Sequence, residues 1–366
     1  MGARYRSARL GTPFAVLTGI LSVAACGSSA PPPSSGASGA PATQSAPASI
    51  TIATNTVSAN YAPVLAADAL GYFTKENLNV TLSYTGGSPL ASLVSGRVDL
   101  IAFGGFSATM AAVNTGAPPI TTIYNMDSGG VSLYMIGSTK VQKIQDCTRV
   151  GNSGAGGAGY TWANTLQASL HTSWTNVPAA NAAALQALFA SDNIDCMIFV
   201  YAGTNPFVLS GKAHWLINPE DTQKYPYPQG ISQTLVSQIP AGTIYGMSSW
   251  VSTHHDEVTR FLRALQRAIP ALRGSPVALT KTLMQEAPYA QSMGGDVDKA
   301  IVDVTHAQYY LSPNDGMIPK ESWPAVQDFV IAGGSTFVSK TDAKWSYDKF
   351  VDMSMLQAAN QSLGNK

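Results

Sequence analysis

The feature that most constrains this chain is a short stretch that occurs twice. "SGRVDLIAFGG" (95–105) and "SDNIDCMIFVYAG" (191–203) carry a Ser, a branched aliphatic residue, an Asp and a Phe at matching positions. In both, an apolar run with helical spacing precedes the stretch, and an apolar run typical of a strand follows the aliphatic residue. The repeat predicts two similar halves. We expect Asp99 and Asp195 to bond backbone in the turn before each strand, without a catalytic role.

The remaining pattern supports this division, because strand-like and helix-like segments alternate along the chain. Such alternation predicts parallel βαβ units. The pattern restarts near residue 139 and becomes largely helical from Thr253 onward. We therefore expect a first lobe over 49–138, a second lobe over 139–243, and over 244–366 a strand that returns to the first lobe and C-terminal helices. Helices are predicted over 60–73, closed by Gly71, and over 276–290, among other segments.

The N-terminal segment predicts export. Residues 1–25 contain three Arg, then an apolar run and small residues, which is typical of a signal peptide. The apolar run is too short to span a membrane. "VAAC" resembles a bacterial lipobox, so we expect lipidation at Cys26 and a protein anchored by lipid to the outer face of the cytoplasmic membrane. Residues 26–48 are rich in Pro, Ser, Ala and Gly and predict a disordered linker.

Charge and cysteine content limit the partners. Cleavage before Cys26 removes three Arg and no acid, and leaves 18 basic and 21 acidic residues, a net charge of −3. No basic block is present, so we expect no nucleic acid partner. Cys147 and Cys196 each begin an apolar run. Because export permits oxidation, we expect a disulfide between them, with two buried thiols as the alternative.

Several segments together resemble one family of extracytoplasmic binding proteins. They are "YAPVLAADALGYFTKENLNVTL", "GGSPLASLVSGRVDLIAFGGFSATMAAVNTGAPPITTI", "VQKIQDCTRVGNSGAGGAGYTWANTLQ" and "WVSTHHDEVTRFLRALQRAI". Over about residues 50–275 the chain is similar to the nitrate/sulfonate/taurine and thiamine-precursor binding proteins of ABC importers. The resemblance implies an α/β, two-lobed periplasmic-binding-protein-like (type II) fold. Each lobe would be a mostly parallel sheet flanked by helices, followed by a helical C-terminal part.

The resemblance also implies a function. It is that of a receptor that captures a small organic solute or an oxyanion between two lobes and delivers it to a permease and its ATPase. Sulfonate, nitrate, taurine-like and heterocyclic vitamin-precursor solutes all stay open. We expect a monomer, with no cofactor and no resident metal.

The binding residues are expected at the carboxyl ends of the strands, where loops meet helix N-termini. The Gly-rich stretch 154–161 is equally consistent with an anion cradle and with a flexible turn. Asp127 is the acid expected in the cleft, where it would meet an amine or a ring N–H; a solvated loop acid with no role in binding is the commoner alternative. The candidate residues are Asn60, Tyr61, Gly87, Ser88, Phe106, Ser107, Asn125, Asp127, Gly157, Tyr160, Thr161 and Tyr201.

Other functions are less consistent with the sequence. "THHDE" (253–257) lacks the spacing of a zinc motif, and it predicts Thr253 as a helix N-cap with acids in the first turn. A pyrimidine-synthase relative shares the implied fold, but its cysteine-rich iron-binding segment is missing here. We therefore expect no enzyme. A ligand-sensing or structural lipoprotein of the same fold stays an alternative.

Overall fold

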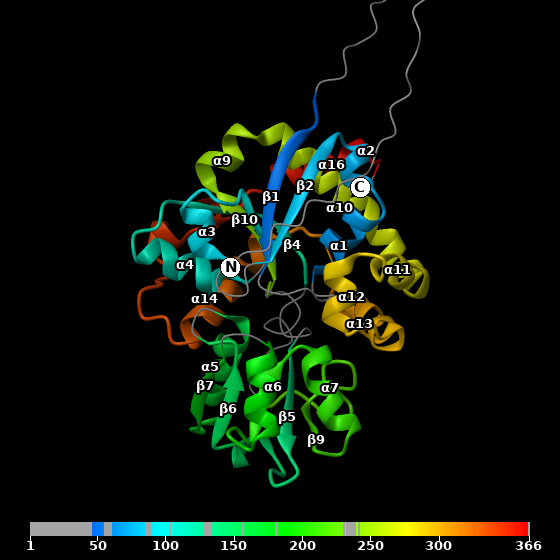
Figure 1. Cartoon of the computed structure of the whole chain (residues 1–366). Coiled ribbons are helices and arrows are strands. Elements are labelled where there is room, and N and C mark those ends of the chain that lie inside the picture. Colours follow the sequence, from blue (N-terminus) through cyan, green and yellow to red (C-terminus); the bar gives the residue numbers. More distant parts are fainter. Residues whose placement is uncertain are drawn as a thin grey trace, which may run out of the picture. The chain divides into compact units, whose positions relative to one another are not determined.

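The structure is a computed structural model of the whole chain (Figure 1). It describes residues 46–54, 61–84, 89–102, 104–127, 133–154, 157–179, 182–229, 231, 239–240, 242–312 and 314–364. The chain from Pro47 to Lys366 forms one compact unit. Cys26 and the predicted signal peptide lie outside the described residues. In the described part, no helix combines the length and the apolarity needed to cross a membrane.

The first lobe is built on a sheet of strand order β2-β1-β3-β10-β4. β1 pairs in parallel with both β2 and β3, and β10 is antiparallel to β3 and β4. Ile50, Ile52 and Leu100 are almost completely buried, as expected for strands covered on both faces. The strands are β1 (Ala48–Thr54), β2 (Leu78–Tyr84), β3 (Leu100–Ala102), β4 (Ile120–Asn125) and β10 (Thr243–Met247).

The second lobe repeats this arrangement with the order β7-β6-β8-β5-β9. β6 pairs in parallel with β7 and β8, and β5 is antiparallel to β8 and β9. The antiparallel strand β10 of the first sheet comes from after the second lobe, whereas β5 directly precedes the other strands of the second sheet. The strands are β5 (Tyr134–Ser138), β6 (Arg149–Asn152), β7 (Thr175–Pro178), β8 (Cys196–Phe199) and β9 (Ala213–Ile217).

β5 gives one difference from the sequence interpretation. The restart near residue 139 placed this segment at the end of the first lobe, whereas it belongs to the second sheet through its pairing with β8 and β9. All five of its residues are buried. A fully buried strand shows no alternation that would identify which sheet it enters.

Helices cover both sheets. In the first lobe, Gly71 adopts φ 68° and closes the helix predicted over 60–73, as expected. A second short helix, α2, begins directly after it. The first lobe has α1 (Ala62–Ala69), α2 (Tyr72–Lys75), α3 (Leu90–Val94) and α4 (Phe106–Asn114). The second has η3 (Ile144–Asp146), α5 (Ala158–Leu170), α6 (Ala182–Ala190) and α7 (Tyr201–Leu209).

The C-terminal helices complete the core of the first lobe. α10 packs its apolar face on α1 and α16, and Phe261 stacks on Phe73 of α2. The helix predicted over 276–290 is two helices. The segment consists of α9 (Ser248–Thr253), α10 (His255–Gly274), α11 (Pro276–Leu283), α12 (Ala287–Met293), α13 (Val297–Tyr310), η4 (Lys320–Ser322), α14 (Trp323–Ala332), η5 (Ala343–Trp345), α15 (Tyr347–Phe350) and α16 (Ser354–Ser362).

The start of α10 corrects one prediction. Asp256 and Glu257 lie in its first turn as expected, but Thr253 is not the N-cap. Thr253 ends α9, and its hydroxyl donates to the backbone carbonyls of Ser249 and Trp250. The N-cap position belongs to His254, whose side chain makes no cap hydrogen bond. Thr253 instead belongs to α9, a short helix directly before α10 that the residue spacing alone did not predict.

The repeated acids have equivalent places in the two lobes. The carboxylate of Asp99 accepts a hydrogen bond of 2.7 Å from the backbone N–H of Thr51 in β1. The carboxylate of Asp195 accepts from the N–H groups of Thr148 and Arg149 at the start of β6, at 3.0 to 3.2 Å. Each acid therefore bonds backbone as expected, but in the neighbouring parallel strand instead of its own turn.

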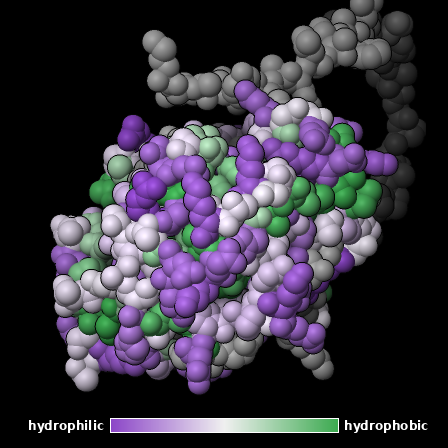
Figure 2. Space-filling model, turned by 90° about the horizontal axis from the view of Figure 1, so that it is seen from below, coloured by the Kyte–Doolittle hydropathy of each residue, from purple (hydrophilic) through white to green (hydrophobic). Residues whose placement is uncertain are grey.

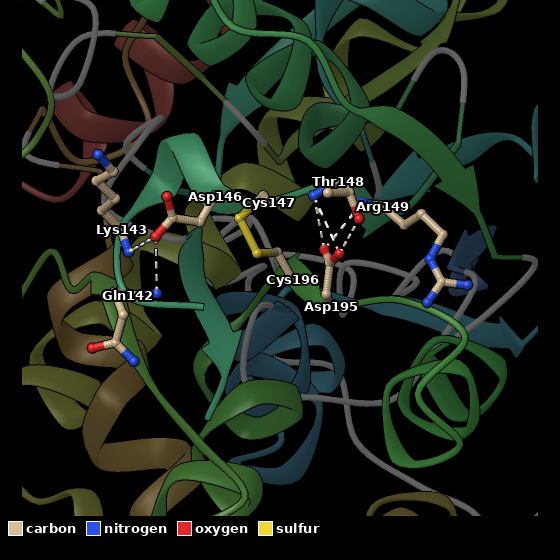
Figure 3. Close-up of a disulfide and its surroundings, with 8 residues drawn as sticks. All are labelled: Gln142, Lys143, Asp146, Cys147, Thr148, Arg149, Asp195 and Cys196. Carbon is tan, nitrogen blue, oxygen red and sulfur yellow. Dashed lines mark hydrogen bonds between the residues drawn. A yellow bond between two sulfur atoms is a disulfide. The ribbon is translucent and has the colours of Figure 1, made fainter. Parts of the chain in front are cut away.

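The two cysteines beside Asp195 form a disulfide (Figure 3). Cys147 follows η3, and Cys196 is the first residue of β8; their Cα atoms are 5.9 Å apart. Nearby, Asp146 accepts from the backbone N–H groups of Gln142 and Lys143. The disulfide thus fastens the amino edge of the second sheet, at the opposite end of β8 from Phe199.

Candidate functional site

The carboxyl edges of the two sheets lie next to each other. β4 ends at Asn125 and β5 begins at Tyr134, so the chain passes from one edge to the other over a short connection. The side chain of Tyr134 belongs to the hydrophobic core of the first lobe, and Tyr201 and Trp215 of the second lobe pack against that core. Facing carboxyl edges are where open α/β sheets bind ligands.

Asp127 lies at the edge of the first sheet, as predicted, and it is 4% exposed. Its Oδ1 atom accepts a hydrogen bond of 2.6 Å from the backbone N–H of Gly242, just before β10. The residue also pairs with Leu311 in an isolated bridge that follows α13. Asp127 therefore joins the end of β4 to the start of β10 and to the C-terminal segment.

Tyr61 and Asn125 lie at the same edge and are both about 5% exposed. Burial, and to a smaller extent the negative charge of Asp127, raises the pKa of the Tyr61 phenol far above its ordinary range, so this hydroxyl stays protonated. The Nδ2 atom of Asn125 donates to the hydroxyl of Ser312 at 3.3 Å. Its Oδ1 atom is buried without a hydrogen-bond partner among the described residues.

The lobes touch where α4 meets α5. The hydroxyl of Thr161 donates to the hydroxyl of Ser107 at 3.0 Å, and Phe106 packs its edge against Trp323 of α14 with ring centroids 4.9 Å apart. A cavity of about 10 Å³ lies here, lined in part by Phe106, Ser107 and Phe329. A space of this size holds about one water molecule. Ser107 and Thr161 thus meet directly in this conformation, with no room for a solute between them.

α14 is the third element at this contact. The Nδ2 atom of Asn164 in α5 donates to the backbone carbonyl of Gly333, directly after α14, at 2.7 Å. A Cβ atom at Gly333 would lie 2.3 Å from Thr161 Cγ2, so the close approach requires glycine. The C-terminal segment therefore holds the two lobes together at one side of the edge.

Gly157 is the N-cap of α5, with an extended backbone and φ −83°. Its hydrogen atom faces Ser153, because a Cβ atom there would lie 2.3 Å from the serine Oγ. Steric closeness, not a left-handed backbone, is what requires glycine at this position. Tyr160 is half-buried one turn further along. The remaining candidates, Asn60, Gly87 and Ser88, lie outside the described residues.

Tyr201, the first residue of α7, lies in an aromatic group at the edge of the second sheet. It stacks on Trp215 with centroids 5.9 Å apart and meets Tyr134 edge-on at 5.3 Å. The ring of His306 stacks on it at 3.5 Å and 18°. Burial, followed by the negative charge of Glu220, raises the pKa of the Tyr201 phenol.

Sequence reasoning missed Tyr134, Trp215, Glu220 and His306. Glu220 follows β9, so recognising "AHWLI" as a strand would have placed Glu220 at a carboxyl edge. His306 carries no such signal, since it lies on a C-terminal helix outside both repeats. The charged side chains described here at the two edges are the acids Asp127 and Glu220, together with the titratable imidazole of His306. Stacking rings, hydroxyls and carboxylates are the chemistry of a binding site.

Two places have the residue types of a metal site. In the described part of the chain, Cys147, Asp195 and Cys196 gather within ligand distance, but both sulfur atoms are used in the disulfide. At "THHDE", the ring of His254 stacks on Trp250 at 4.5 Å, and its Nδ1 atom lies 2.9 Å from the Trp250 carbonyl oxygen. His254 is thus held by its own helix.

Solved structures with this fold include several binding proteins. The ligand-binding component of an ABC-type import system from Staphylococcus aureus superposes with a TM-score of 0.65 at 13% identity, covering 85% of this chain and 99% of that one. The alkanesulfonate-binding protein SsuA from Xanthomonas axonopodis pv. citri gives 0.59 at 17% identity, covering 79% and 94%. The nitrate-binding protein NrtA from Synechocystis PCC 6803 gives 0.63 at 12% identity, covering 86% and 89%.

These likenesses confirm the predicted two-lobed periplasmic-binding-protein fold. No curated protein matches the chain at a significant level. The family model described as NMT1/THI5 like matches residues 58–278, which agrees with the extent of the resemblance in the sequence. Since this match covers more than half of the chain, the chain belongs to the NMT1/THI5-like family.

Proposed function

We propose that the protein is an extracytoplasmic solute-binding receptor of an ABC importer. The observation that carries this proposal is the pair of equivalent sheets, β2-β1-β3-β10-β4 and β7-β6-β8-β5-β9, whose carboxyl edges are adjacent. The chain crosses between them through β5 and β10. Crossing strands of this kind allow two lobes to close on a ligand by hinge bending. A permease can then distinguish the loaded receptor from the empty one by the position of its lobes.

The solute is a small organic molecule or an oxyanion, and it binds between the lobes. Tyr61, Asn125 and Asp127 contribute from the first lobe, and Thr161 and Tyr201 from the second. Sulfonate, nitrate and taurine-like solutes would require backbone N–H groups, such as those at the N-terminus of α5, to neutralise the anion. A heterocyclic vitamin precursor would instead use the aromatic rings and the acids.

Export and anchoring rest on the sequence. Cleavage before Cys26 and acylation of its thiol would hold the receptor on the outer face of the cytoplasmic membrane, next to the permease and ATPase. Incorporation of radiolabelled palmitate into the full chain tests this, with Cys26→Ser as the control. We expect label and membrane association for the wild type and neither for the variant. Equal labelling of both would contradict the lipid anchor.

The receptor is proposed to act as a monomer. Hydrophilic and hydrophobic residues are interspersed on the face seen in Figure 2. Among the described residues, the exposed large hydrophobic side chains are spread over the sequence, from Val94 to Ile331, and the most exposed is Leu209. Exposed apolar side chains are common on the surfaces of monomeric proteins.

A thermal unfolding screen of residues 27–366 tests the receptor function. The panel contains taurine, alkanesulfonates, nitrate and aminopyrimidines. A solute at 100 times its dissociation constant stabilises the folded state by about 2.7 kcal/mol, which raises the melting temperature by a few degrees. No shift with any solute, from a folded sample, would contradict the receptor proposal and favour a structural lipoprotein.

A further inference from the structure

His306 belongs to α13, yet its ring lies against the second lobe. α13 packs on α10, α11 and α12 of the helical part and also contacts α7. The imidazole stacks on Tyr201, with ring centroids 3.5 Å apart and planes 18° from parallel. Its Nδ1 atom lies 2.6 Å from Oε1 of Glu220. One ring from the C-terminal segment is thus held on two sides by residues of the second lobe.

The carboxylate that receives this ring is itself fixed. The hydroxyl of Tyr134 donates to the same Oε1 atom of Glu220, and the Glu220 backbone N–H donates to Oδ1 of Asn218 at 3.0 Å. The side chains of Glu220 and His306 are each 17% exposed. A carboxylate accepts hydrogen bonds, so this position suits a ring that presents an N–H group to Glu220.

The residues under the ring all belong to the second lobe. Tyr201 begins α7, Trp215 is in β9, Tyr134 is in β5 and Glu220 follows β9. Trp215 stacks on Tyr201, and Tyr134 meets both rings, at 5.3 Å from Tyr201 and 5.4 Å from Trp215. The second lobe alone therefore supplies a stacking face and a positioned carboxylate at its carboxyl edge.

We propose that Tyr201 and Glu220, supported by Tyr134 and Trp215, form a ring-binding subsite which His306 occupies when the solute is absent. The inference rests on the proposed receptor function and names the class of its solute. The subsite takes a flat ring that carries an N–H group or a positive charge, because a tyrosine face and a carboxylate both attract such a ring. The solute enters by displacing the imidazole, which also releases α13 from the second lobe.

Imidazole itself is the probe for this subsite. His306→Ala removes the internal ring and leaves Tyr201 and Glu220 in place. We expect this variant to bind imidazole at least about tenfold more tightly than the wild type does, by calorimetry near neutral pH. His255→Ala, which removes an exposed histidine at the start of α10, is the matched control and should behave as the wild type.

Specificity comes from Glu220 and from the charge of the probe. Adding Glu220→Gln to His306→Ala should lower the affinity for imidazole by about tenfold, since it replaces the charged acceptor. Benzenesulfonate, a flat anion, should not bind to His306→Ala. A folded His306→Ala protein that binds imidazole no better than the wild type overturns the proposal.

A second measurement does not depend on the folding of His306→Ala. In the wild type labelled with 15N-histidine, the His306 ring signal is identified by its absence in His306→Gln. Excess 4-aminopyridine should move this signal to the position of a solvent-exposed ring. An unchanged signal overturns the proposal.

The receptor function and the subsite can fail separately. If a solute of the screening panel binds the wild type and His306→Ala with equal affinity, the receptor stands and the subsite is overturned. If His306→Ala binds imidazole while the whole panel leaves the wild type unchanged, the subsite stands and the receptor function is contradicted.

Discussion

The hydroxyl of Thr161 donates to the hydroxyl of Ser107 at 3.0 Å, which joins α5 of the second lobe to α4 of the first. This is a contact between the two lobes made by side chains that are predicted to bind solute. A solute between the lobes would compete with this hydrogen bond. The strength of the hydrogen bond therefore adds to the free energy required to open the site.

Thr161→Val tests this bond. The substitution keeps the shape of the side chain and removes the hydroxyl, and it should destabilise the protein by about 1 kcal/mol in urea unfolding. Thr165→Val is the matched control, because Thr165 is also buried on α5 but donates within its own helix, to the Thr161 carbonyl at 2.9 Å. Only Thr161→Val should change solute affinity. An equal change in both variants would show that the bond has no role between the lobes.

The disulfide should contribute to stability without affecting binding. Replacing Cys147 and Cys196 by Ser opens a loop with a sequence separation of 49 residues. The chain-entropy argument gives a loss of about 4 kcal/mol in the free energy of unfolding. Calorimetry of the variant, and of the wild type with and without reductant, measures this loss. Solute affinity should stay unchanged, since the disulfide lies at the amino edge of its sheet; a large fall in affinity would contradict this.

Asp68 should make stability depend on pH. Burial, followed by the negative charge of Glu286, raises the pKa of Asp68 from 3.8 to about 6. Between these values the folded protein keeps a proton that the unfolded chain has lost, so the stability contributed by this group falls as the pH rises from about 4 to about 6. Asp68→Asn should therefore be more stable than the wild type at about pH 7.5, by at most about 3 kcal/mol, and nearly equal to it at about pH 4.

The check is urea unfolding of both proteins at the two pH values. Glu286→Gln removes the second cause and should give a smaller gain in the same direction. A difference between Asp68→Asn and the wild type that is equal at both pH values would contradict the assignment to this carboxyl group.

Glu76 holds α10 to the first lobe and should be costly to neutralise. It is 7% exposed, and its two oxygens lie 2.8 Å from Nε of Arg263 and 2.7 Å from Arg267. Glu76→Gln should destabilise by about 3 kcal/mol, because it leaves two partly buried guanidinium groups without their partner. Asp348→Asn, which breaks the exposed pair with Lys320, should cost less than about 1 kcal/mol. Similar losses for both would contradict the role of burial.

Much of the two-lobed fold could be predicted, because local sequence patterns indicate its strands and helices. The predicted division into two similar halves is present as two equivalent sheets, and the repeated acids have the same place in both. Gly71 closes the first helix as predicted. The helix predicted over 276–290 is instead two helices, because the apolar spacing continues through the break between them. Buried β5 was placed in the wrong lobe for a related reason.

The candidate site was only partly predictable. The rule that ligands bind at the carboxyl edges of sheets identified Asp127 and Tyr201 as candidates. It could not bring in His306, because the packing of α13 against α7 depends on long-range contacts between side chains that no local spacing records. A residue such as His306, which lies on one part of the fold and contacts another, cannot be found from the sequence repeat that identifies the two lobes.

The place of β10 in the first sheet also determines how the chain can fold. β3 and β4 are separated in the first sheet by β10, which is synthesised only after the entire second lobe. The first sheet therefore stays incomplete until about two thirds of the chain is available. The first lobe is therefore not expected to fold as an isolated N-terminal fragment, whereas the strands of the second sheet all lie within residues 134–217. Pairings as distant in sequence as those of β10 make folding slow. A chain that folds late in this way stays unfolded for longer, which leaves time for its export before it folds.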